Sequence, residues 1–483
     1  MKWSKVSGLM AAMLIAANLQ AQQTKPQKAL DPATQQLARD IFKQLVDIDT
    51  TASTGNTTIA AEAMRKRLLD AGFAPKDVVV LGPTPTTGNM VARLHGRSGS
   101  KLKPVLIICH LDVVEARRAE WNTDPFVFTE KDGYFYGRGT QDMKDADAAM
   151  ITSFIRMKRE GYVPDRDLIL ALTAGEESGK NNGVDWLLKN HRSLIDAEFV
   201  LNPDAGGVTS KNGKPFLMGV EATEKLYADY RVRATNPGGH SSLPTRNNAI
   251  YHVADALSRL EKYSFPFELN EVSRAELATR AKLAHGQEAV DLRAILKTPP
   301  DAAAIRRLSA DPLYNAKMRT TCVATMFSAG HATNALPSRA QANVNCRILP
   351  GHSQEEVRQQ LIRVFAAPTL TVAYTTGGGE ELGKGSSRMS APPPPLKEEV
   401  FKPLRETVQA IWPGMTILPE MQTGASDSVY TMAEGIPSYG FNGMAIDEGD
   451  DREHGINERL GVESYYTGVE FTYRYLKAMT GGQ

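Results

Sequence analysis

The stretch KPVLIICHLD at residues 103–112 decides the fold class, because its unbroken apolar run is typical of a β-strand buried on both faces. The run ends at His110, and ligands of open α/β sheets collect beyond the carboxyl ends of the strands. Asp112 could accept the proton on the other ring nitrogen of this histidine and fix the tautomer that binds a metal. Taken alone, a structural histidine is the more common alternative.

Further segments repeat the pattern of an apolar strand followed by potential metal ligands. They are residues 167–173 before Glu176 and Glu177, residues 199–202 before Asp204, and residues 438–441 before the loop that contains His454. Asp142 lies in a glycine-rich turn, GRGTQDMK at 137–144, that leads into a helical pattern. Adjacent glutamates are usually surface residues. Here an apolar strand leads into them, which favours a metal-binding site, because paired carboxylates repel each other unless a cation lies between them.

The set therefore contains two histidines and four carboxylates expected at one edge of a sheet. Mixed imidazole and carboxylate ligands suit zinc, with cobalt or manganese as substitutes, and the lack of thiolates in the set argues against a structural zinc site. Two metals about 3.5–4 Å apart need a bridging carboxylate. Five ligands and one spare carboxylate fit two Zn²⁺.

Helical and strand patterns alternate around these segments, which predicts an α/β domain with a mostly parallel sheet covered by helices. After residue 222 the pattern changes to β-α-β-β-α-β, which predicts an inserted α+β, ferredoxin-like lid. A charged, helix-prone insert at about 265–317 interrupts the lid, and its role stays open. The predicted parts are a signal peptide at 1–21, a catalytic domain at 22–222 and 379–483, and the lid at 223–378.

Composition narrows the classes of partner. At 483 residues, the chain exceeds the size of one hydrophobic core, and 56 Lys and Arg against 55 Asp and Glu leave no basic field to recruit nucleic acid. A basic start followed by a short apolar run predicts a signal peptide and an exported, periplasmic or secreted protein, with an uncleaved anchor as the alternative. No later segment is apolar enough to span a membrane, so the mature protein should have no membrane span.

The three cysteines are Cys109, Cys322 and Cys346, and each lies in an apolar, strand-like run. An odd number in such runs favours small buried thiols over a disulfide framework. A pair between Cys322 and Cys346 stays open as the alternative.

These residues resemble the metallopeptidase family that includes glutamate carboxypeptidase, carboxypeptidase S, aminoacylase and succinyl-diaminopimelate desuccinylase. The resemblance covers nearly the whole mature chain and implies that His110 and Asp204 hold one zinc, that Glu177 and His454 hold the other, and that Asp142 bridges them. It also implies that Glu176 is the general acid/base. We count Asp112 with the catalytic residues because of its expected contact with the His110 ring. The insert and the start of the strand after it look most like the carboxypeptidase S and N-acyl amino acid hydrolase branch.

Two lid segments are similar to the family's substrate-binding motifs. PGGHSSLP at 237–244 implies that His240 stabilises the oxyanion, in dimeric members from the partner subunit. The second segment is GHATNALP at 330–337, which is followed by Arg347. Its similarity implies that Asn334 and Arg347 bind the carboxylate of the substrate. The resemblance implies a homodimer through the lid, which the long insert could block. The role of His331 stays unassigned.

We therefore expect a di-zinc hydrolase that cleaves an amide bond next to a free carboxylate, as a carboxypeptidase, dipeptidase or N-acyl amino acid hydrolase. Its substrate would be a small peptide or an N-acyl amino acid. The alternative within the same fold is a catalytically silent peptide-binding protein. An unrelated serine esterase lacks support, because the sequence has no G-x-S-x-G elbow.

Overall fold

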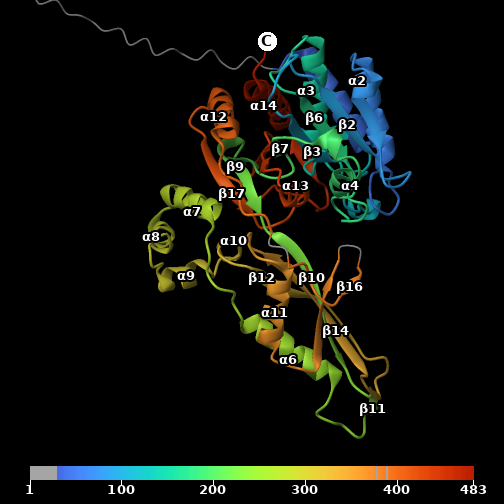
Figure 1. Ribbon diagram of the computed structural model, residues 1–483, viewed down its shortest axis with the longest axis vertical. Helices are drawn as coiled ribbons and strands as arrows, with labels where there is room; N and C mark the ends of the chain where they lie inside the picture. The colour runs from blue at the N-terminus through green and yellow to red at the C-terminus, as the bar shows by residue number, and fades with distance from the viewer. Residues whose placement is uncertain (1–29, 377–378, 388–389, 483) are drawn as a thin grey trace, which may run out of the picture.

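The structure is a computed structural model that describes residues 30–376, 379–387 and 390–482. The predicted signal peptide at 1–21 lies outside the described residues. Two bodies follow one another along the longest axis, a larger α/β body and a smaller lid that projects from it (Figure 1). Among the described residues, no helix is both long and apolar enough to cross a membrane.

The larger body is built on a ten-stranded sheet with the order β1-β2-β6-β3-β7-β18-β9-β8-β19, in which β17 also pairs with β9. Its strands are β1 (Val78–Leu81), β2 (Asn89–Leu94), β3 (Val105–His110), β6 (Leu168–Thr173), β7 (Phe199–Asn202), β8 (Gly207–Lys211), β9 (Lys214–Glu224), β17 (Thr416–Gln422), β18 (Ser438–Gly440) and β19 (Ala445–Asp447). The neighbours β6, β3, β7 and β18 run parallel, so their carboxyl ends meet at one edge. The predicted α/β class with a mostly parallel central sheet is confirmed.

The central strand β3 is buried on both faces, as its sequence predicts. Val105, Ile107 and Cys109 pack into one hydrophobic cluster, whereas Leu106 and Ile108 pack into the cluster on the other face. Because successive side chains of a strand point to opposite faces, a strand between two helical layers must be apolar throughout.

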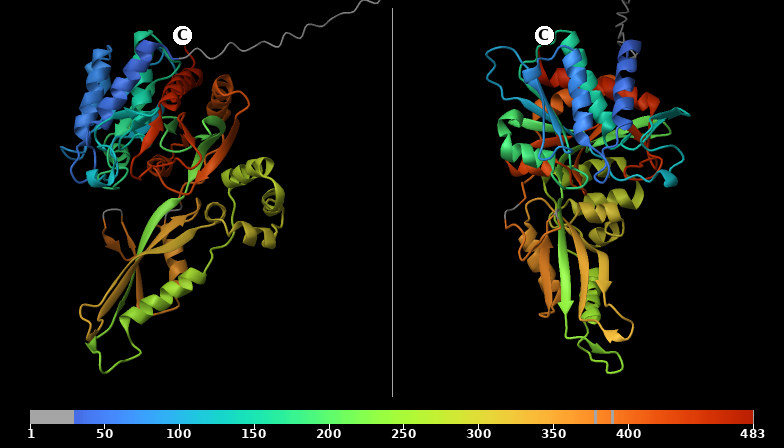
Figure 2. Two further views of the ribbon diagram at one scale, coloured as in Figure 1. Left: turned by 180° about the vertical axis from the view of Figure 1, so that it is seen from behind. Right: turned by 90° about the vertical axis from the view of Figure 1, so that its right-hand side faces the viewer.

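Helices cover both faces of this sheet (Figure 2). Those packed in the first cluster are α1 (Pro32–Val46), α2 (Thr57–Asp70), α3 (Lys144–Arg159), α12 (Glu398–Ile411) and α14 (Val462–Thr480). Those of the second are α4 (Gly183–Asn190), α5 (Arg192–Ile195) and α13 (Ser428–Ala433). Asp31 caps α1 by accepting a hydrogen bond from Thr34 N. A small separate sheet joins β4 (Thr129–Lys131), β5 (Tyr134–Tyr136) and β20 (Arg459–Gly461).

The lid has a five-stranded antiparallel sheet in the order β12-β14-β10-β15-β16. Its elements are β10 (Leu226–Thr235), α6 (Ala249–Lys262), β12 (Thr321–Ala329), β14 (Arg339–Ile348), α11 (Gln354–Phe365), β15 (Leu370–Thr375) and β16 (Glu381–Leu382). The short strands β11 (Gly239–His240) and β13 (Ala335–Leu336) pair at the far tip. The order of the main elements is the predicted β-α-β-β-α-β, and α6 and α11 share one cluster with the sheet.

The insert at about 265–317 forms four helices, α7 (Glu271–Leu283), α8 (Gly286–Ile295), α9 (Ala302–Leu308) and α10 (Pro312–Lys317), with a small core of their own. Although the insert belongs to the lid in sequence, it lies against strand β17 of the larger body. Arg280 pairs with Glu420 of that strand at 2.9 Å, and the Lys317 ammonium pairs with buried Glu276 at 3.0 Å.

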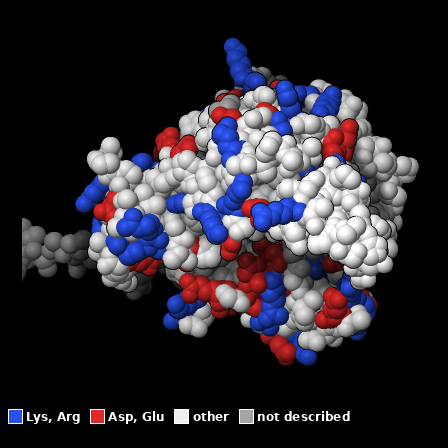
Figure 3. Space-filling model, turned by 90° about the horizontal axis from the view of Figure 1, so that it is seen from below, with Lys and Arg blue, Asp and Glu red and all other residues white. Residues whose placement is uncertain are grey.

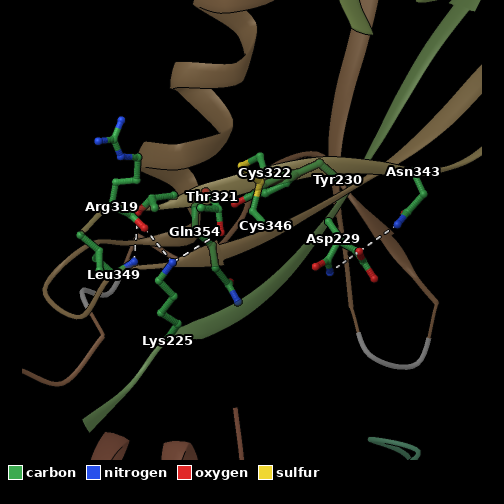
Figure 4. Close-up of a disulfide and its surroundings, with 12 residues drawn as sticks. Lys225, Asp229, Tyr230, Arg319, Thr321, Cys322, Asn343, Cys346, Leu349 and Gln354 are labelled. Carbon is green, nitrogen blue, oxygen red and sulfur yellow. Dashed lines mark hydrogen bonds between the residues drawn. A yellow bond between two sulfur atoms is a disulfide. The ribbon is translucent and has the colours of Figure 1, made fainter. Parts of the chain in front are cut away.

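Cys322 and Cys346 form a disulfide that joins β12 to β14 (Figure 4). Our prediction of free thiols was wrong for these two residues and confirmed for Cys109, which is buried and unpaired. The reason is register: Cys322 and Cys346 face each other directly across the two antiparallel strands, with their Cα atoms 4.1 Å apart. Sequence patterns identify both strands but not this pairing.

Candidate active site

The predicted ligands meet at the carboxyl edge of the large sheet. His110 is the last residue of β3, Glu176 and Glu177 follow β6, and Asp204 follows β7. Asp142 lies just before α3, and His454 lies in the loop after β19. Adjacent parallel strands therefore bring together side chains that are far apart in sequence.

Asp142 lies between the two histidines and contacts each with a different oxygen. His110 Nε2 is 3.0 Å from Asp142 Oδ1, and His454 Nε2 is 2.9 Å from Asp142 Oδ2. On the far side of each histidine lies another carboxylate: Asp204 Oδ1 is 3.4 Å from His110 Nε2, and Glu177 Oε2 is 3.0 Å from His454 Nε2. The five residues thus form two half-sites that share one carboxylate.

The donor set fits a metal better than it fits a hydrogen-bond network. Within the described part of the chain, Asp142 Oδ1 and Glu177 Oε1 are buried and have no hydrogen-bond partner, although His110 Nε2 is close to the first of them. Ligand atoms of His110, Asp142 and Glu177 all lie within 4.8 Å of one another. Buried carboxylate oxygens without donors are costly unless a cation pairs with them.

The carboxylates and histidines strongly perturb one another. Hydrogen bonds to Asp142 and Glu177 raise the pKa of His454 to about 10. Burial raises the pKa of Glu176 well above its usual range, and the negative charge of Asp204 raises it further. A carboxyl group with a raised pKa beside a ligand set is suited to proton transfer.

Asp112 acts on the site differently from our expectation. The ring Nδ1 of His110 lies 2.9 Å from the main-chain carbonyl of Asp112, so the backbone rather than the carboxylate fixes the ring. The Asp112 carboxylate instead accepts hydrogen bonds from Glu176 N at 3.2 Å and Glu177 N at 3.1 Å. The predicted pairing of that carboxylate with the ring was wrong, because the two backbone N–H groups of the Glu176 turn occupy its oxygens.

Arg347 lines the same cavity as Glu176, His454 and Asp204, and this cavity has a volume of about 550 Å³. Its guanidinium lies 4.8 Å from the centre of the Tyr227 ring. Viewed from below, acidic side chains also gather in a hollow of the molecular surface (Figure 3).

His240 and Asn334 do not lie in this cavity. Both are exposed, and they lie together at the tip of the lid farthest from the larger body (Figure 1), where Ser241 N donates to the Asn334 carbonyl at 3.1 Å. The ring Nδ1 of His240 accepts a hydrogen bond from Ser242 N at 3.1 Å. Since Nδ1 accepts, the neutral ring carries its proton on Nε2 and can donate from there.

Comparison with known proteins identifies the family of this chain. Residues 106–478 match the profile described as Peptidase family M20/M25/M40. This chain belongs to that family. As an M20 peptidase it is a hydrolase that acts on C–N bonds and uses a divalent metal.

Relatives of this M20 peptidase include the N-fatty-acyl-amino acid synthase/hydrolase PM20D1 of Homo sapiens, which is 30% identical over 393 residues, covering 79% of this chain and 75% of that protein. The probable carboxypeptidase S-like 2 of Dictyostelium discoideum is 29% identical over 390 residues, covering 78% and 72% of the two chains.

Solved structures of the M20 fold superpose on nearly the whole chain. The M20 family metallo-carboxypeptidase Sso-CP2 from Sulfolobus solfataricus matches with a TM-score of 0.66 and 17% identity, covering 93% of this chain and 100% of that one. Human carnosine dipeptidase 1 matches with a TM-score of 0.63 and 16% identity, covering 93% and 97%.

Sequence reasoning missed one residue that supports the site of this M20 peptidase. Glu458 is fully buried and pairs with Arg138 at 2.6 Å. Its carboxylate also accepts hydrogen bonds from the backbone N–H groups of Gly139, Gln141 and Asp142, at 3.1, 2.6 and 3.2 Å. The position of Glu458 just after the loop that contains His454 was the available signal, but its partners lie more than 300 residues away.

Proposed function

We propose that this M20 peptidase is a dinuclear zinc hydrolase that cleaves an amide bond next to a free carboxylate. The observation that supports this most is the position of Asp142, whose two oxygens contact the two histidines separately. A carboxylate between two imidazoles is the arrangement that a two-metal site requires.

In this proposal His110 and Asp204 hold one zinc, Glu177 and His454 hold the other, and Asp142 bridges them. Two histidines and three carboxylates suit Zn²⁺, and Co²⁺ or Mn²⁺ could substitute. The bound metals would make a water molecule nucleophilic and polarise the amide carbonyl.

Glu176 moves the proton in this proposal. It lies in the cavity next to the ligand set without completing either half-site, so its carboxylate is free to take a proton from the attacking water and give it to the departing amine. The Asp112 carboxylate positions it by holding the Glu176 and Glu177 backbone N–H groups.

Arg347 is the proposed partner of the substrate carboxylate. A guanidinium can bind a carboxylate with two parallel hydrogen bonds, which a lysine cannot do. Because Arg347 and the metal-binding residues line one cavity, a substrate held by Arg347 lies within reach of the metals. Small peptides and N-acyl amino acids with a free carboxyl group are the proposed substrates.

We also propose a homodimer through lids formed by residues 223–378. Strand β12 is the edge of the lid sheet, and its side chains Val323, Met326 and Phe327 are 60%, 69% and 49% exposed. An exposed apolar edge strand is suited to pairing with a second chain. In such a dimer, His240 of the partner subunit would supply an oxyanion donor, because His240 lies outside the cavity of its own chain.

Export through a signal peptide at 1–21 remains part of the proposal. The Cys322–Cys346 disulfide supports it, because disulfides persist mainly in oxidising compartments such as the periplasm or the extracellular space.

Metal content and substrate range test the function directly. We expect about two zinc ions per chain by elemental analysis and complete loss of hydrolysis after chelation, with recovery on adding Zn²⁺. Activity should be confined to substrates with a free carboxyl group. A protein that keeps its activity after chelation would contradict the metal mechanism, and equal rates on amidated substrates would remove the role of Arg347.

Mixing two inactive variants tests the contribution of the partner subunit. His240→Ala and Glu176→Gln should each be nearly inactive alone. In an equal mixture, half of the randomly formed dimers contain one chain of each variant, and each of these dimers has one intact site. The mixture should therefore recover about a quarter of the wild-type activity. Activity that does not rise on mixing, while cross-linking of differently tagged chains shows mixed dimers, would contradict the contribution of the partner subunit's His240.

A further inference from the structure

The lining of the catalytic cavity is almost entirely polar. Of the lining residues in the described part of the chain, the apolar ones are Ala205, Ala425, Gly206 and Gly424, so none has a side chain larger than a methyl group. A long acyl chain gains about 0.8 kcal/mol for each methylene that an apolar wall buries. This cavity offers such a chain no apolar wall, whereas its polar lining can form hydrogen bonds with a short polar substrate.

Two glutamates in this cavity belong to neither half-site. Glu221 and Glu224 lie near the end of β9, only 1% and 4% exposed, and both line the cavity. Among the described residues, Glu221 Oε2 and Glu224 Oε1 find no hydrogen-bond partner. The second oxygen of Glu224 accepts a hydrogen bond from Ser426 N at 2.6 Å, which fixes the direction of the side chain.

The surroundings of Glu221 offer it little positive charge. Its charged neighbours include the carboxylates of Asp204, Glu224 and Glu420 and the ammonium of Lys317. That ammonium is already paired with Glu276 at 3.0 Å and bonded to the Met421 carbonyl. A buried carboxyl group without a dedicated cation is costly to ionise, and a positively charged ligand beside it would lower that cost.

We propose that Glu221 and Glu224 bind a cationic group of the substrate, an ammonium or a guanidinium. This inference rests on the proposed function and narrows its substrate class: Arg347 binds the carboxylate of the substrate and the two glutamates bind a positive charge elsewhere on it. The favoured substrates are short peptides with a free α-amino group or a basic side chain. N-acyl amino acids with long apolar chains are disfavoured.

Four substrates with a common C-terminal leucine test the proposal on the zinc-loaded protein. Alanyl-leucine carries a positive charge on its α-amino group, and N-acetyl-lysyl-leucine carries one on its lysine side chain. N-acetyl-alanyl-leucine has no positive charge, and N-lauroyl-leucine has a long apolar acyl chain. We expect kcat/KM for at least one cationic substrate to exceed that for N-acetyl-alanyl-leucine by roughly 10- to 100-fold, the usual range for a hydrogen bond to a charged group. The cationic substrate that is preferred identifies the source of the charge.

Glu221→Gln removes the charge and keeps the shape of the side chain. The ratio of kcat/KM between the preferred cationic substrate and N-acetyl-alanyl-leucine should fall at least tenfold in this variant and be retained in Glu406→Gln, which changes an exposed glutamate on α12. Zinc content should equal that of the wild type in both variants.

Several outcomes would overturn the inference. These are equal rates on neutral and cationic substrates, a preference for N-lauroyl-leucine, or a zinc deficit in Glu221→Gln, which would make Glu221 a metal ligand. If Glu221→Gln fails to fold, the ratio of kcat/KM between cationic and neutral substrates in the wild type tests the inference alone. If the protein hydrolyses none of the four substrates, the proposed function itself is contradicted. Failure of the proposed function is thus distinguished from failure of the inference about Glu221 and Glu224.

Discussion

Glu176→Gln should lower kcat by about 10²- to 10⁴-fold, the usual contribution of a positioned general acid/base. The amide of glutamine fills the same space but cannot take a proton from water or return one to the leaving amine. Since Glu176 completes neither half-site, zinc content should stay at the wild-type level. Steady-state kinetics on the best dipeptide and elemental analysis of the same preparation measure both quantities.

Glu406→Gln, on the exposed face of α12, is the matched control and should retain wild-type kcat. Wild-type turnover in Glu176→Gln would show that another group moves the proton. If turnover and zinc were lost together, Glu176 would be a ligand, and the division of the site into five ligands and one base would be wrong.

Arg138→Met should destabilise the fold by about 3–5 kcal/mol, the usual cost of leaving one partner of a buried ion pair without the other. Arg138 and Glu458 are 2% and 0% exposed, and the Arg138 guanidinium also lies 5.1 Å from the centre of the Trp121 ring. Removing the cation leaves the Glu458 carboxylate buried among backbone donors alone. The midpoint of guanidinium chloride unfolding should therefore fall clearly.

Arg306→Met, which replaces an exposed arginine on α9, should leave that midpoint unchanged. We also expect weaker zinc retention in Arg138→Met, because Glu458 holds the backbone N–H of Asp142. An unfolding midpoint equal to that of the control would show that water or another group satisfies Glu458 once Arg138 is gone.

The parts of the fold and site that sequence predicts are those that depend on local pattern. An apolar run of five residues followed by His110 specifies a strand, its burial and the edge at which the histidine lies. The same reasoning applies to the segments before Glu177 and Asp204, and parallel pairing then brings their ends together without further information.

The parts that sequence does not predict depend on partners chosen by the tertiary structure. Strand β9 has Pro215 and Gly219 within it, so its pattern does not identify a strand, and Glu221 and Glu224 were consequently not recognised as cavity residues. The Cys322–Cys346 bond depends on strand register, and the direction of the Asp112 carboxylate depends on two backbone N–H groups after β6. In each case the sequence identifies the residue type but not the residue that it contacts in the fold.

The docking of the α7–α10 insert on β17 has a mechanical consequence. Arg280 and Lys317 fasten the insert to Glu420 and to the Met421 carbonyl, so its helices move with the larger body. Any swing of the lid sheet must then bend the chain where it joins this unit, including Lys225 between β9 and β10, residues 263–270 between α6 and α7, and residues 318–320 between α10 and β12. Because several short connections join the lid sheet to this unit, they together restrict how far the lid can open away from the metal-binding edge.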